Sequence, residues 1–283
     1  APWCGGLSAH KRQCSLDGSQ PAFVAGNGIF GGANRLYKDD QTSWGCDVMR
    51  ALNRSFCYFI RQIAADKMLV MVCAAPLLCG AFFRFGIPAM EPLFIKWFGF
   101  GLGPYYLLLD LFLSGLTPYM LCFVSAMVIL TEADSHMSAY LCVTPIGKKG
   151  YLASRLFFPA VLSGLVSFCV LTAFRLSVDS ALITAGLSLQ SAVLGMLTAM
   201  LIISLASNKV EGMAISKLSG LILFGMVIPF VLKGSGKYVF GLLPSFWIAQ
   251  WAITPGFGAI LMFSGTSVLW FFVLWRRFSL KLT

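Results

Sequence analysis

The chain has 283 residues, of which 58% are hydrophobic and only 11% are charged, and its mean hydropathy is +0.81. Soluble domains carry about a quarter charged residues, so this composition excludes an ordinary water-soluble protein. The formal net charge of +10 does not indicate a nucleic-acid partner, because the 21 Lys and Arg residues fall singly or in pairs between apolar runs. That distribution is typical of membrane topology.

The nine cysteines do not indicate a redox or metal site. None forms a CxxC pair, and four lie inside apolar stretches, where cysteine is most simply a small buried hydrophobe: Cys73, Cys79, Cys122 and Cys169. The two histidines, His10 and His136, are too few for a histidine-based metal site. We therefore expect this chain to bind no metal and no cofactor.

Residues 1–48 are rich in Gly, Ser, Asn and Asp and lack the apolar stretch of a signal peptide, so we predict that they are disordered. Met49 then opens a segment that looks like the natural start of a membrane protein. The upstream residues are either an extension without a function or a regulatory tail. The predicted domains are thus a disordered extension, 1–48, and a membrane domain, 49–283.

The remaining chain predicts an all-α fold, a polytopic bundle of about six transmembrane helices. A bilayer core about 30 Å thick needs roughly 20 apolar residues, at about 1.5 Å per residue. Six segments qualify, at approximately 68–83, 106–130, 156–174, 181–206, 218–232 and 258–275. The first and fifth are short, so they must either extend into flanking residues or tilt little.

An amphipathic segment precedes the first span, between Arg50 and Lys67. Charged Arg54 and Arg61 alternate there with apolar residues near helical spacing, namely Leu52, Phe56, Phe59, Ile60 and Ile63. This pattern predicts an interfacial helix on the inner leaflet.

The positive-inside rule gives the orientation. If residues 49–67 lie inside, the cytoplasmic side holds twelve basic residues: Arg50, Arg54, Arg61, Lys67, Lys148, Lys149, Arg155, Lys209, Lys217, Arg276, Arg277 and Lys281. The outer side then holds five: Arg84, Lys96, Arg175, Lys233 and Lys237. We therefore predict a multi-pass protein of the cytoplasmic membrane with both ends of its core in the cytoplasm.

The loop after the second span, residues 132–152, predicts a short helix across the cytoplasmic mouth of the bundle. Glu132 and Asp134 suit a helix N-terminus, and Thr144-Pro145 ends the helix. Its apolar face consists of Met137, Tyr140, Leu141 and Val143. From these residues alone, the segment is either a docking helix or a capped connector.

This part of the sequence resembles the membrane subunit of type-2 ATP-binding cassette (ABC) transporters, and it is most similar to the fluoroquinolone or drug export permease branch. The resemblance runs from Met49 to the C-terminus. It rests on Glu132-Ala133-Asp134, Val143-Thr144-Pro145, Tyr151-Leu152 with Arg155, Asn208-Lys209-Val210-Glu211-Gly212 with Ser216-Lys217, and Leu242-Leu243-Pro244-Ser245-Phe246-Trp247. The family's Gly-Thr pair after the acidic residues is replaced by Ser135-His136-Met137.

The resemblance implies a permease that exports an amphipathic or hydrophobic compound while a separate subunit binds Mg and hydrolyses ATP. This chain has no phosphate loop of its own, since Gly234-Ser235-Gly236-Lys237 lacks the first glycine and precedes Tyr238. The implied partners are an ABC ATP-binding subunit, a second permease subunit in a homodimer or heterodimer, and the lipid bilayer. The first cytoplasmic loop would be the coupling helix, with Glu132, Asp134, Tyr140, Thr144 and Pro145 at or near the ATPase.

Four polar residues lie nearest the membrane interior. Asp110, Arg175 and Asp179 flank the outer ends of spans, where we expect them to reach water or to pair with one another. Gln190 lies about ten residues into the fourth span. It either hydrogen-bonds to a neighbouring helix or lines the translocation path.

Two further patterns concern packing. Ser191, Gly195 and Ala199 recur every four residues, which predicts a close approach of another helix. Trp247 and Trp251 predict a short outer helix anchored at the interface. In the family this region re-enters the membrane, whereas an aromatic belt alone has the same composition.

Two other classes of membrane protein have similar hydropathy, namely ion-coupled secondary transporters and membrane enzymes. An ion-coupled secondary transporter is the alternative, but the sequence shows neither mid-membrane carboxylates nor Gly/Pro-broken helices in matched halves. A membrane enzyme is not expected, because both histidines lie outside the spans and no G-x-S-x-G motif occurs. Six helices enclose little volume, so we expect the route to run at a subunit interface.

Overall fold

The computed structural model describes residues 57, 59–99, 101–135, 153–178, 180–232 and 234–281. The chain divides into two units, Ala1–Cys46 and Asp47–Thr283, and every described residue belongs to the second unit. The predicted disorder of residues 1–48 therefore stays a prediction. Tyr140, Thr144 and Pro145 also lie outside the described residues.

The described residues form only helical elements, and six of their helices are long and apolar enough to cross a membrane. These candidate spans are Lys67–Trp97, Gly103–Asp134, Arg155–Phe174, Ala181–Leu205, Lys209–Val231 and Phe257–Phe278. The prediction of an all-α bundle with about six spans is confirmed. The first and fifth spans extend into their flanking residues, as their short apolar cores required.

Most spans are built from more than one helical element. The elements in chain order are α2 (Lys67–Ala81), η1 (Phe82–Gly86), α3 (Ile87–Phe98), η2 (Gly103–Tyr105), α4 (Tyr106–Asp134), η3 (Ala153–Phe157), α7 (Phe158–Phe174), α8 (Ala181–Leu205), α9 (Lys209–Ser219), η4 (Gly220–Met226), α10 (Ile228–Val231), η5 (Ser235–Leu242), α11 (Pro244–Ile253) and α12 (Phe257–Lys281). Residues 59–65 are also helical, which agrees with the predicted amphipathic helix over that part of it.

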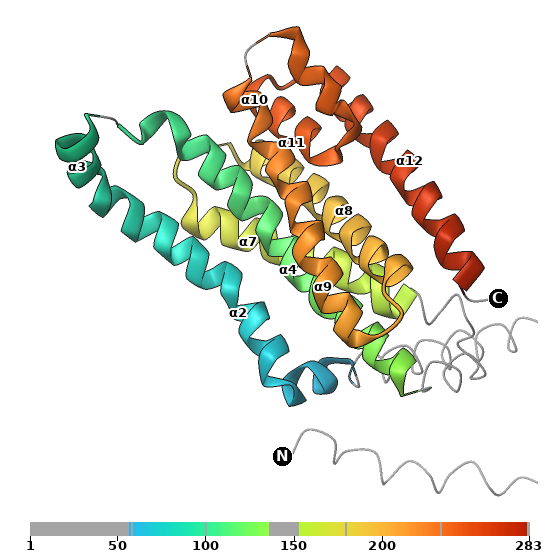
Figure 1. Cartoon of the computed structure of the whole chain (residues 1–283). Helices are drawn as coiled ribbons and strands as arrows, with labels where there is room; N and C mark the ends of the chain where they lie inside the picture. The colour runs from blue at the N-terminus through green and yellow to red at the C-terminus, as the bar shows by residue number, and fades with distance from the viewer. Residues whose placement is uncertain are drawn as a thin grey trace, which may run out of the picture. The chain divides into compact units, whose positions relative to one another are not determined.

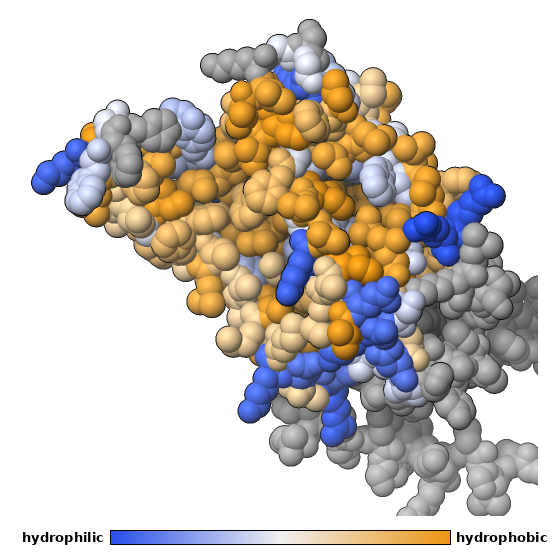
Figure 2. Space-filling model, viewed as in Figure 1, coloured by the Kyte–Doolittle hydropathy of each residue, from blue (hydrophilic) through white to orange (hydrophobic). Residues whose placement is uncertain are grey.

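The spans differ sharply in how much of their surface the protein covers. In the most apolar stretch of each span, 89% of the residues of the α4 span and 72% of those of α8 are buried, against 17% for the first and last spans. In Figure 1, α4 and α8 run through the middle of the bundle, and α2 and α12 run along its margins. Hydrophobic residues dominate the visible face of the helices (Figure 2). The margins therefore present apolar surface to lipid or to another subunit.

The contact between α4 and α8 depends on small residues. A Cβ atom added at Gly195 would lie 2.8 Å from the Pro118 carbonyl oxygen, so the two backbones approach closely there. One turn earlier, the Ser191 and Ser114 hydroxyl oxygens are 3.0 Å apart, and Ala199, one turn later, is fully buried. The predicted small-residue face is confirmed, and α4 is the helix that it approaches.

Pro118 also explains a polar contact in the middle of the bundle. Proline has no N–H, so the carbonyl of Ser114, four residues earlier in α4, loses its helical hydrogen bond. The Ser167 hydroxyl of α7 donates to this carbonyl at 3.1 Å. Because hydrocarbon offers no replacement partner, this bond satisfies the freed carbonyl and joins α7 to α4.

Asp110 does not reach water, which was one of the two expectations for the polar residues at the outer ends of the spans. Its side chain is 1% exposed, and it accepts backbone N–H bonds of 2.7–3.2 Å from residues 176–178 in the turn between α7 and α8. The Arg84 guanidinium donates to the Arg175 carbonyl of the same turn at 2.9 Å. Asp110 and Arg84 thus hold this turn by its backbone, through charge-assisted hydrogen bonds. Asp179 lies outside the described residues.

Three of the spans contain turns that are not α-helical. The first and third contain π-helical turns at Phe82–Gly86 and Ala153–Phe157, and the fifth changes to a 3₁₀ helix over Gly220–Met226. Such interruptions alter the i→i−4 hydrogen bonds and are common at places where a helix bends. The expected absence of Gly/Pro-broken helices in matched halves stays a prediction.

The short helix α11 is packed inside the bundle. Phe246, Ile248 and Ala249 are fully buried, and α11 contacts η4, α8 and α12. The Trp251 ring lies against Gly186 near the start of α8, where a side chain would clash with it. These contacts show that α11 packs against its neighbours, and the choice between a re-entrant segment and an interfacial aromatic belt stays a prediction.

Gly195→Ala tests the close contact between α4 and α8. The new Cβ would meet the Pro118 backbone, which cannot yield as a flexible side chain would, so we expect a loss of about 1–3 kcal/mol in the free energy of unfolding. Equilibrium unfolding of the purified chain in SDS–detergent mixtures measures it. Gly265→Ala is the matched control, because nothing lies within 4 Å of a Cβ added in that part of α12. Equal effects of the two substitutions would contradict the close contact.

Candidate functional site

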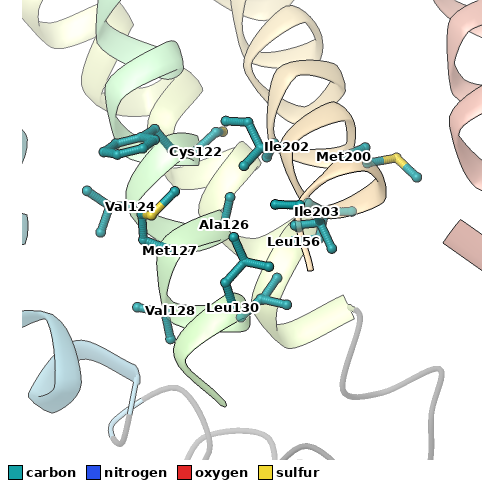
Figure 3. Packing of buried hydrophobic residues seen from close by; sticks show 14 of the residues in the cluster. Cys122, Val124, Ala126, Met127, Val128, Leu130, Leu156, Met200, Ile202 and Ile203 are labelled. Atoms are coloured by element: carbon teal, nitrogen blue, oxygen red, sulfur yellow. The ribbon is translucent and has the colours of Figure 1, made fainter. Parts of the chain in front are cut away.

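The candidate site lies at the end of the bundle where α2, η3 and α9 begin and α4, α8 and α12 end. This is the end that the positive-inside rule predicts to face the cytoplasm, and it is called the predicted cytoplasmic end below. Apolar residues of α4, α8 and the start of the third span meet there (Figure 3). The C-terminal part of α12 joins them, since Trp275 and Phe278 line a small cavity with Leu156 and Ile203.

The structure thus gathers at one end several basic residues that the prediction assigned to one side: Lys67, Arg155, Lys209, Arg276 and Arg277. Hydrophilic residues are also concentrated toward this end in the space-filling view (Figure 2). The common location agrees with the predicted alternation of the spans. Which side of the membrane this end faces stays a prediction.

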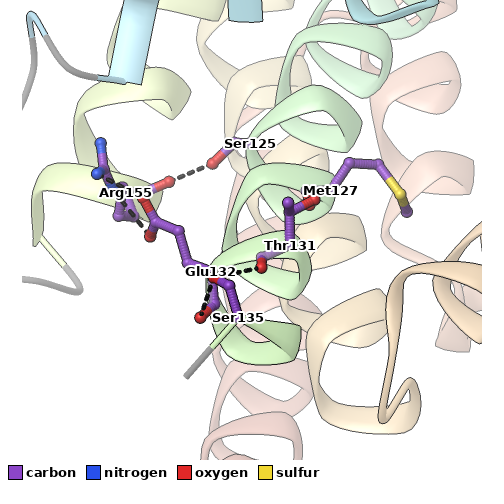
Figure 4. A network of polar contacts seen from close by, with 6 residues as sticks. All are labelled: Ser125, Met127, Thr131, Glu132, Ser135 and Arg155. Carbon is purple, nitrogen blue, oxygen red and sulfur yellow. Dashed lines mark hydrogen bonds and ion pairs between the residues drawn. The ribbon is translucent and has the colours of Figure 1, made fainter. Parts of the chain in front are cut away.

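A buried ion pair is the most prominent feature of this end. Arg155 in η3 donates to Glu132 near the end of α4 through its Nη2 at 2.6 Å and its Nε at 3.3 Å (Figure 4). Both side chains are 0% exposed. Such a pair is stable only when both partners are present, because either charge alone would be buried without compensation.

Further contacts fix Arg155 in place. The Ser125 hydroxyl of α4 donates to the Arg155 backbone carbonyl. The Arg155 guanidinium lies 5.3 Å from the centre of the Phe59 ring, in the helical segment that precedes α2. Cation–π attraction of this kind is strongest where water is excluded. Arg155 therefore ties together the second span, the third span and the amphipathic segment.

The ion pair also lies at the base of the segment that resembles a coupling helix. Glu132 is three residues before Ser135, the C-cap of α4 and the last described residue there, and Arg155 is close to Ala153, where the described chain resumes. The two side chains therefore join the two ends of the described chain that flank residues 136–152.

Asp134 has a different partner. It accepts a 2.9 Å hydrogen bond from the backbone N–H of Lys209, the first residue of α9. Two side chains at the start of α9 cap its N-terminus, since Asn208 accepts from the N–H of Glu211 and Glu211 accepts from the N–H of Ser207. Glu132 and Asp134 are thereby connected to both of the predicted cytoplasmic loops that carry family motifs, one after the second span and one before the fifth.

A second, more exposed ion pair adds α2 to this arrangement. The Lys209 ammonium group lies 3.0 Å from the Asp66 carboxylate, and both side chains are about a third exposed, at 31% and 32%. The hydrogen bond from Lys209 lowers the pKa of Asp66 below its usual value of 3.8. A lowered carboxylate pKa adds stability at neutral pH, and this stability is lost only as the pH falls below about 4.

The residues predicted to contact the ATPase fall into two groups. Glu132 and Asp134 lie at the predicted cytoplasmic end, but Glu132 is buried and cannot itself touch a partner in this arrangement. The structure does not describe Tyr140, Thr144 and Pro145. Their contact with an ATPase stays a prediction.

Gln190 lies near the middle of α8, far from this end. Its side chain is 7% exposed, and its Oε1 atom accepts no hydrogen bond within the part of the chain that the structure describes. This oxygen therefore makes no interhelical hydrogen bond to the described residues. Both interpretations of Gln190, a hydrogen bond to a neighbouring helix and a place on the translocation path, stay predictions.

The sequence did not predict which charged residues pair with one another at this end of the bundle. Arg155 was noticed only as a basic residue and as part of a family motif, and Asp66 and Lys209 were not paired. A signal was present, because Glu132 and Arg155 flank one loop and have opposite charges. Nothing in the sequence indicated that both would be fully buried.

A double-mutant cycle tests the two ion pairs against each other. For Glu132→Gln and Arg155→Met we expect a coupling free energy of about 2 kcal/mol or more, because each single change strands a buried charge or its donors. For Asp66→Asn and Lys209→Met, a partly exposed pair, we expect less than about 1 kcal/mol. SDS unfolding of the four variants and the two double variants gives both values. A coupling near zero for Glu132 and Arg155 would show that the buried pair does not hold the two spans.

Comparison with known proteins places this architecture in a family. Two relatives from Mycobacterium tuberculosis, the fluoroquinolones export permease proteins of strains CDC 1551 / Oshkosh and ATCC 25618 / H37Rv, are each 26% identical to the chain over 242 residues, which is 78% of this chain and 91% of each relative. No solved structure matches the chain significantly. The family model described as "Fluoroquinolones export permease protein Rv2686c-like" matches residues 59–277, nearly all of the membrane unit. The chain therefore belongs to the Rv2686c-like family of fluoroquinolones export permease proteins.

Proposed function

We propose that this protein is the permease subunit of an ABC-type exporter, which moves an amphipathic or hydrophobic compound across the cytoplasmic membrane while a separate subunit hydrolyses ATP. Membership of the export permease family supports the transport activity. The two named relatives make a fluoroquinolone-like drug the first compound to test.

The buried pair of Glu132 and Arg155 is the observation that best supports the coupling mechanism. It joins the two spans that flank the predicted coupling loop, so a movement of that loop would be transmitted to both spans. The receiving helix α4 is the most buried of the spans and contacts α2, α7 and α8. In this proposal Tyr140, Thr144 and Pro145 touch the ATPase, whereas Glu132 positions the loop from within.

The proposed transport unit contains two permease subunits. The cavities at the α8–α11–α12 contact and beside Trp275 have volumes of only about 10 Å³ each, room for a single water molecule. A drug-sized compound needs a pocket of about 300 Å³ or more, and the cavity of about 340 Å³ beside Asp66 lies at the predicted cytoplasmic end and not along the spans. A route between two copies, along the exposed apolar margins of the bundle, would avoid this restriction.

Co-purification tests the coupling proposal. The full chain is expressed with a candidate ABC ATP-binding subunit, and complex formation and ATP turnover are compared for the wild type and Tyr140→Ala. We expect the wild type to bind the ATPase and stimulate it. We expect Tyr140→Ala to lose the stimulation, because a ring that fills a groove on the partner would be removed.

Tyr238→Ala is the control, since Tyr238 is 52% exposed in η5, which lies outside the predicted cytoplasmic end. Glu132 is left intact, because changing it would disturb the buried pair as well as the loop. Failure of the wild type to bind any ATP-binding subunit, together with drug transport that collapses with the proton gradient, would favour an ion-coupled secondary transporter instead.

A further inference from the structure

The first candidate span, Lys67–Trp97, is longer than a bilayer requires. Its 31 residues form a continuous helical path through α2, η1 and α3. At about 1.5 Å per residue this path is about 46 Å long, whereas the hydrocarbon core of a bilayer is about 30 Å thick. Part of the helix must therefore lie outside the core, or the helix must tilt strongly.

A hydrogen bond between two spans indicates which part lies outside. The Arg84 guanidinium in η1 donates to the Arg175 carbonyl at 2.9 Å, and Arg175 is the C-cap of α7. The first span is therefore level with the outer end of the third span at Arg84. From Lys67 to Arg84 the helix already covers about 26 Å, which nearly crosses the core. The helix α3, which follows Arg84, thus begins where the third span ends.

The bundle leaves α3 largely uncovered. Its main contacts are with η1, the turn that precedes it, and none of its described side chains is buried. In Figure 1, α3 lies at the tip of the first span. A 2.5 Å hydrogen bond from the Tyr106 hydroxyl to the Glu91 carboxylate ties α3 to the start of α4. Something other than the described part of this chain must therefore cover its apolar side chains.

These apolar side chains share one face of α3. Spacings of three and four residues place on that face Ile87, Met90, Leu93, Phe94 and Trp97. Three of them, Met90, Leu93 and Trp97, are 41%, 56% and 77% exposed. The opposite face carries Ala89, Pro92 and Lys96. Ile95, which is 52% exposed, is the large apolar residue that falls outside the apolar face. An apolar face opposite a lysine is typical of a helix in the membrane interface.

The junction between α2 and α3 allows the two helices to differ in direction. η1, Phe82–Gly86, is a π-helical turn, and Pro88 follows it at the start of α3. Proline has no N–H to continue the helical hydrogen bonds. Prolines and π-helical turns are the usual places at which helices bend. A bend at η1 would lay α3 along the surface of the bilayer.

We propose that α3 is an interfacial helix on the predicted outer surface of the membrane, and that its partner is the phospholipid head-group layer. Its apolar face lies on the acyl chains, and Lys96 on the opposite face lies toward the lipid phosphates and water. Trp97 anchors the end of the helix, as tryptophan commonly does at this depth. Only α2 and η1 then cross the hydrocarbon core. This inference does not depend on the transported compound or on an ATPase.

Two other orientations of α3 fit the observations less well. If α3 continued straight out of the bilayer, Trp97 would lie about 20 Å beyond Arg84, whereas the interfacial layer on each side is only about 5–8 Å thick. The apolar face would then be in water. If the whole helix tilted until it fitted the core, Glu91 and Lys96 would lie in hydrocarbon, which is unfavourable for charged groups.

The depth of Trp97 tests the proposal. The full chain is labelled with 5-fluorotryptophan and placed in phosphatidylcholine nanodiscs, and the ¹⁹F signal of Trp97 is identified by its loss in Trp97→Phe. One lipid carries a nitroxide on its head group, and another carries it near the end of an acyl chain. We expect the head-group nitroxide to relax Trp97 about threefold or more faster than the deep nitroxide, since an interfacial helix lies only about 5–10 Å into the bilayer. Trp270, near the middle of α12, should show the opposite order.

Two aspartate variants test the face that contacts the lipid. Met90→Asp puts a carboxylate on the apolar face, and Ala89→Asp puts one on the face of Lys96; both sites are exposed, so the bundle should unfold as the wild type does. We expect Met90→Asp to weaken the effect of the head-group nitroxide on Trp97 about twofold or more, because a carboxylate is costly among acyl chains. Ala89→Asp should leave it unchanged.

Three results would overturn the proposal. Stronger relaxation of Trp97 by the deep nitroxide would mean that α3 lies in the core as part of a tilted span. Relaxation by a water-soluble gadolinium complex alone would place α3 in water. If neither lipid label nor the gadolinium complex reached Trp97, a second copy of the chain would be the cover. Equal effects of Met90→Asp and Ala89→Asp would likewise contradict a lipid contact through the apolar face.

Discussion

Hydrocarbon provides no hydrogen-bond partners, so a polar group inside this bundle must be satisfied by another part of the same protein. The described contacts of α4 follow from that constraint. Ser167 satisfies the carbonyl that Pro118 frees, Asp110 takes its hydrogen bonds from the turn between α7 and α8, and Glu132 is neutralised by Arg155. Each bond joins α4 to the third span or the turn that follows it, at the middle and at both ends.

This arrangement makes α4 and α7 a single mechanical unit. Apolar packing alone would hold them weakly, because lipid tails compete equally well for apolar side chains. Three polar attachments along one pair of helices restrict sliding and rotation in a way that apolar contacts do not. A proposed push on the loop between them would then move both helices, and α8 with them through the small-residue contact at Gly195.

The predicted cytoplasmic end also contains a cavity. The proposed coupling loop leaves from the Glu132–Arg155 pair, and a cavity of about 340 Å³ beside Asp66 is walled by the same helix α4 and by α9. Lys209 takes part in both regions, since its backbone donates to Asp134 and its side chain pairs with Asp66. The start of α9 is thereby attached to both α4 and the start of α2.

The sequence by itself determined the fold class, the number of spans and the close approach of a helix to Gly195, because apolar length and small-residue spacing are local properties. It also indicated the permease family, through motifs whose spacing is readable along the chain. Tertiary structure alone decided which charges are buried and with what partners. Asp110 was expected to reach water or to pair with a polar neighbour, Glu132 was expected at or near a partner, and Arg155 was expected only as a basic residue of the family motif. Burial could not be predicted for any of them, because it depends on which helices surround a residue. Six apolar segments of similar hydropathy do not reveal that α4 is central and α2 marginal, since that order is set by long-range contacts which no local pattern encodes.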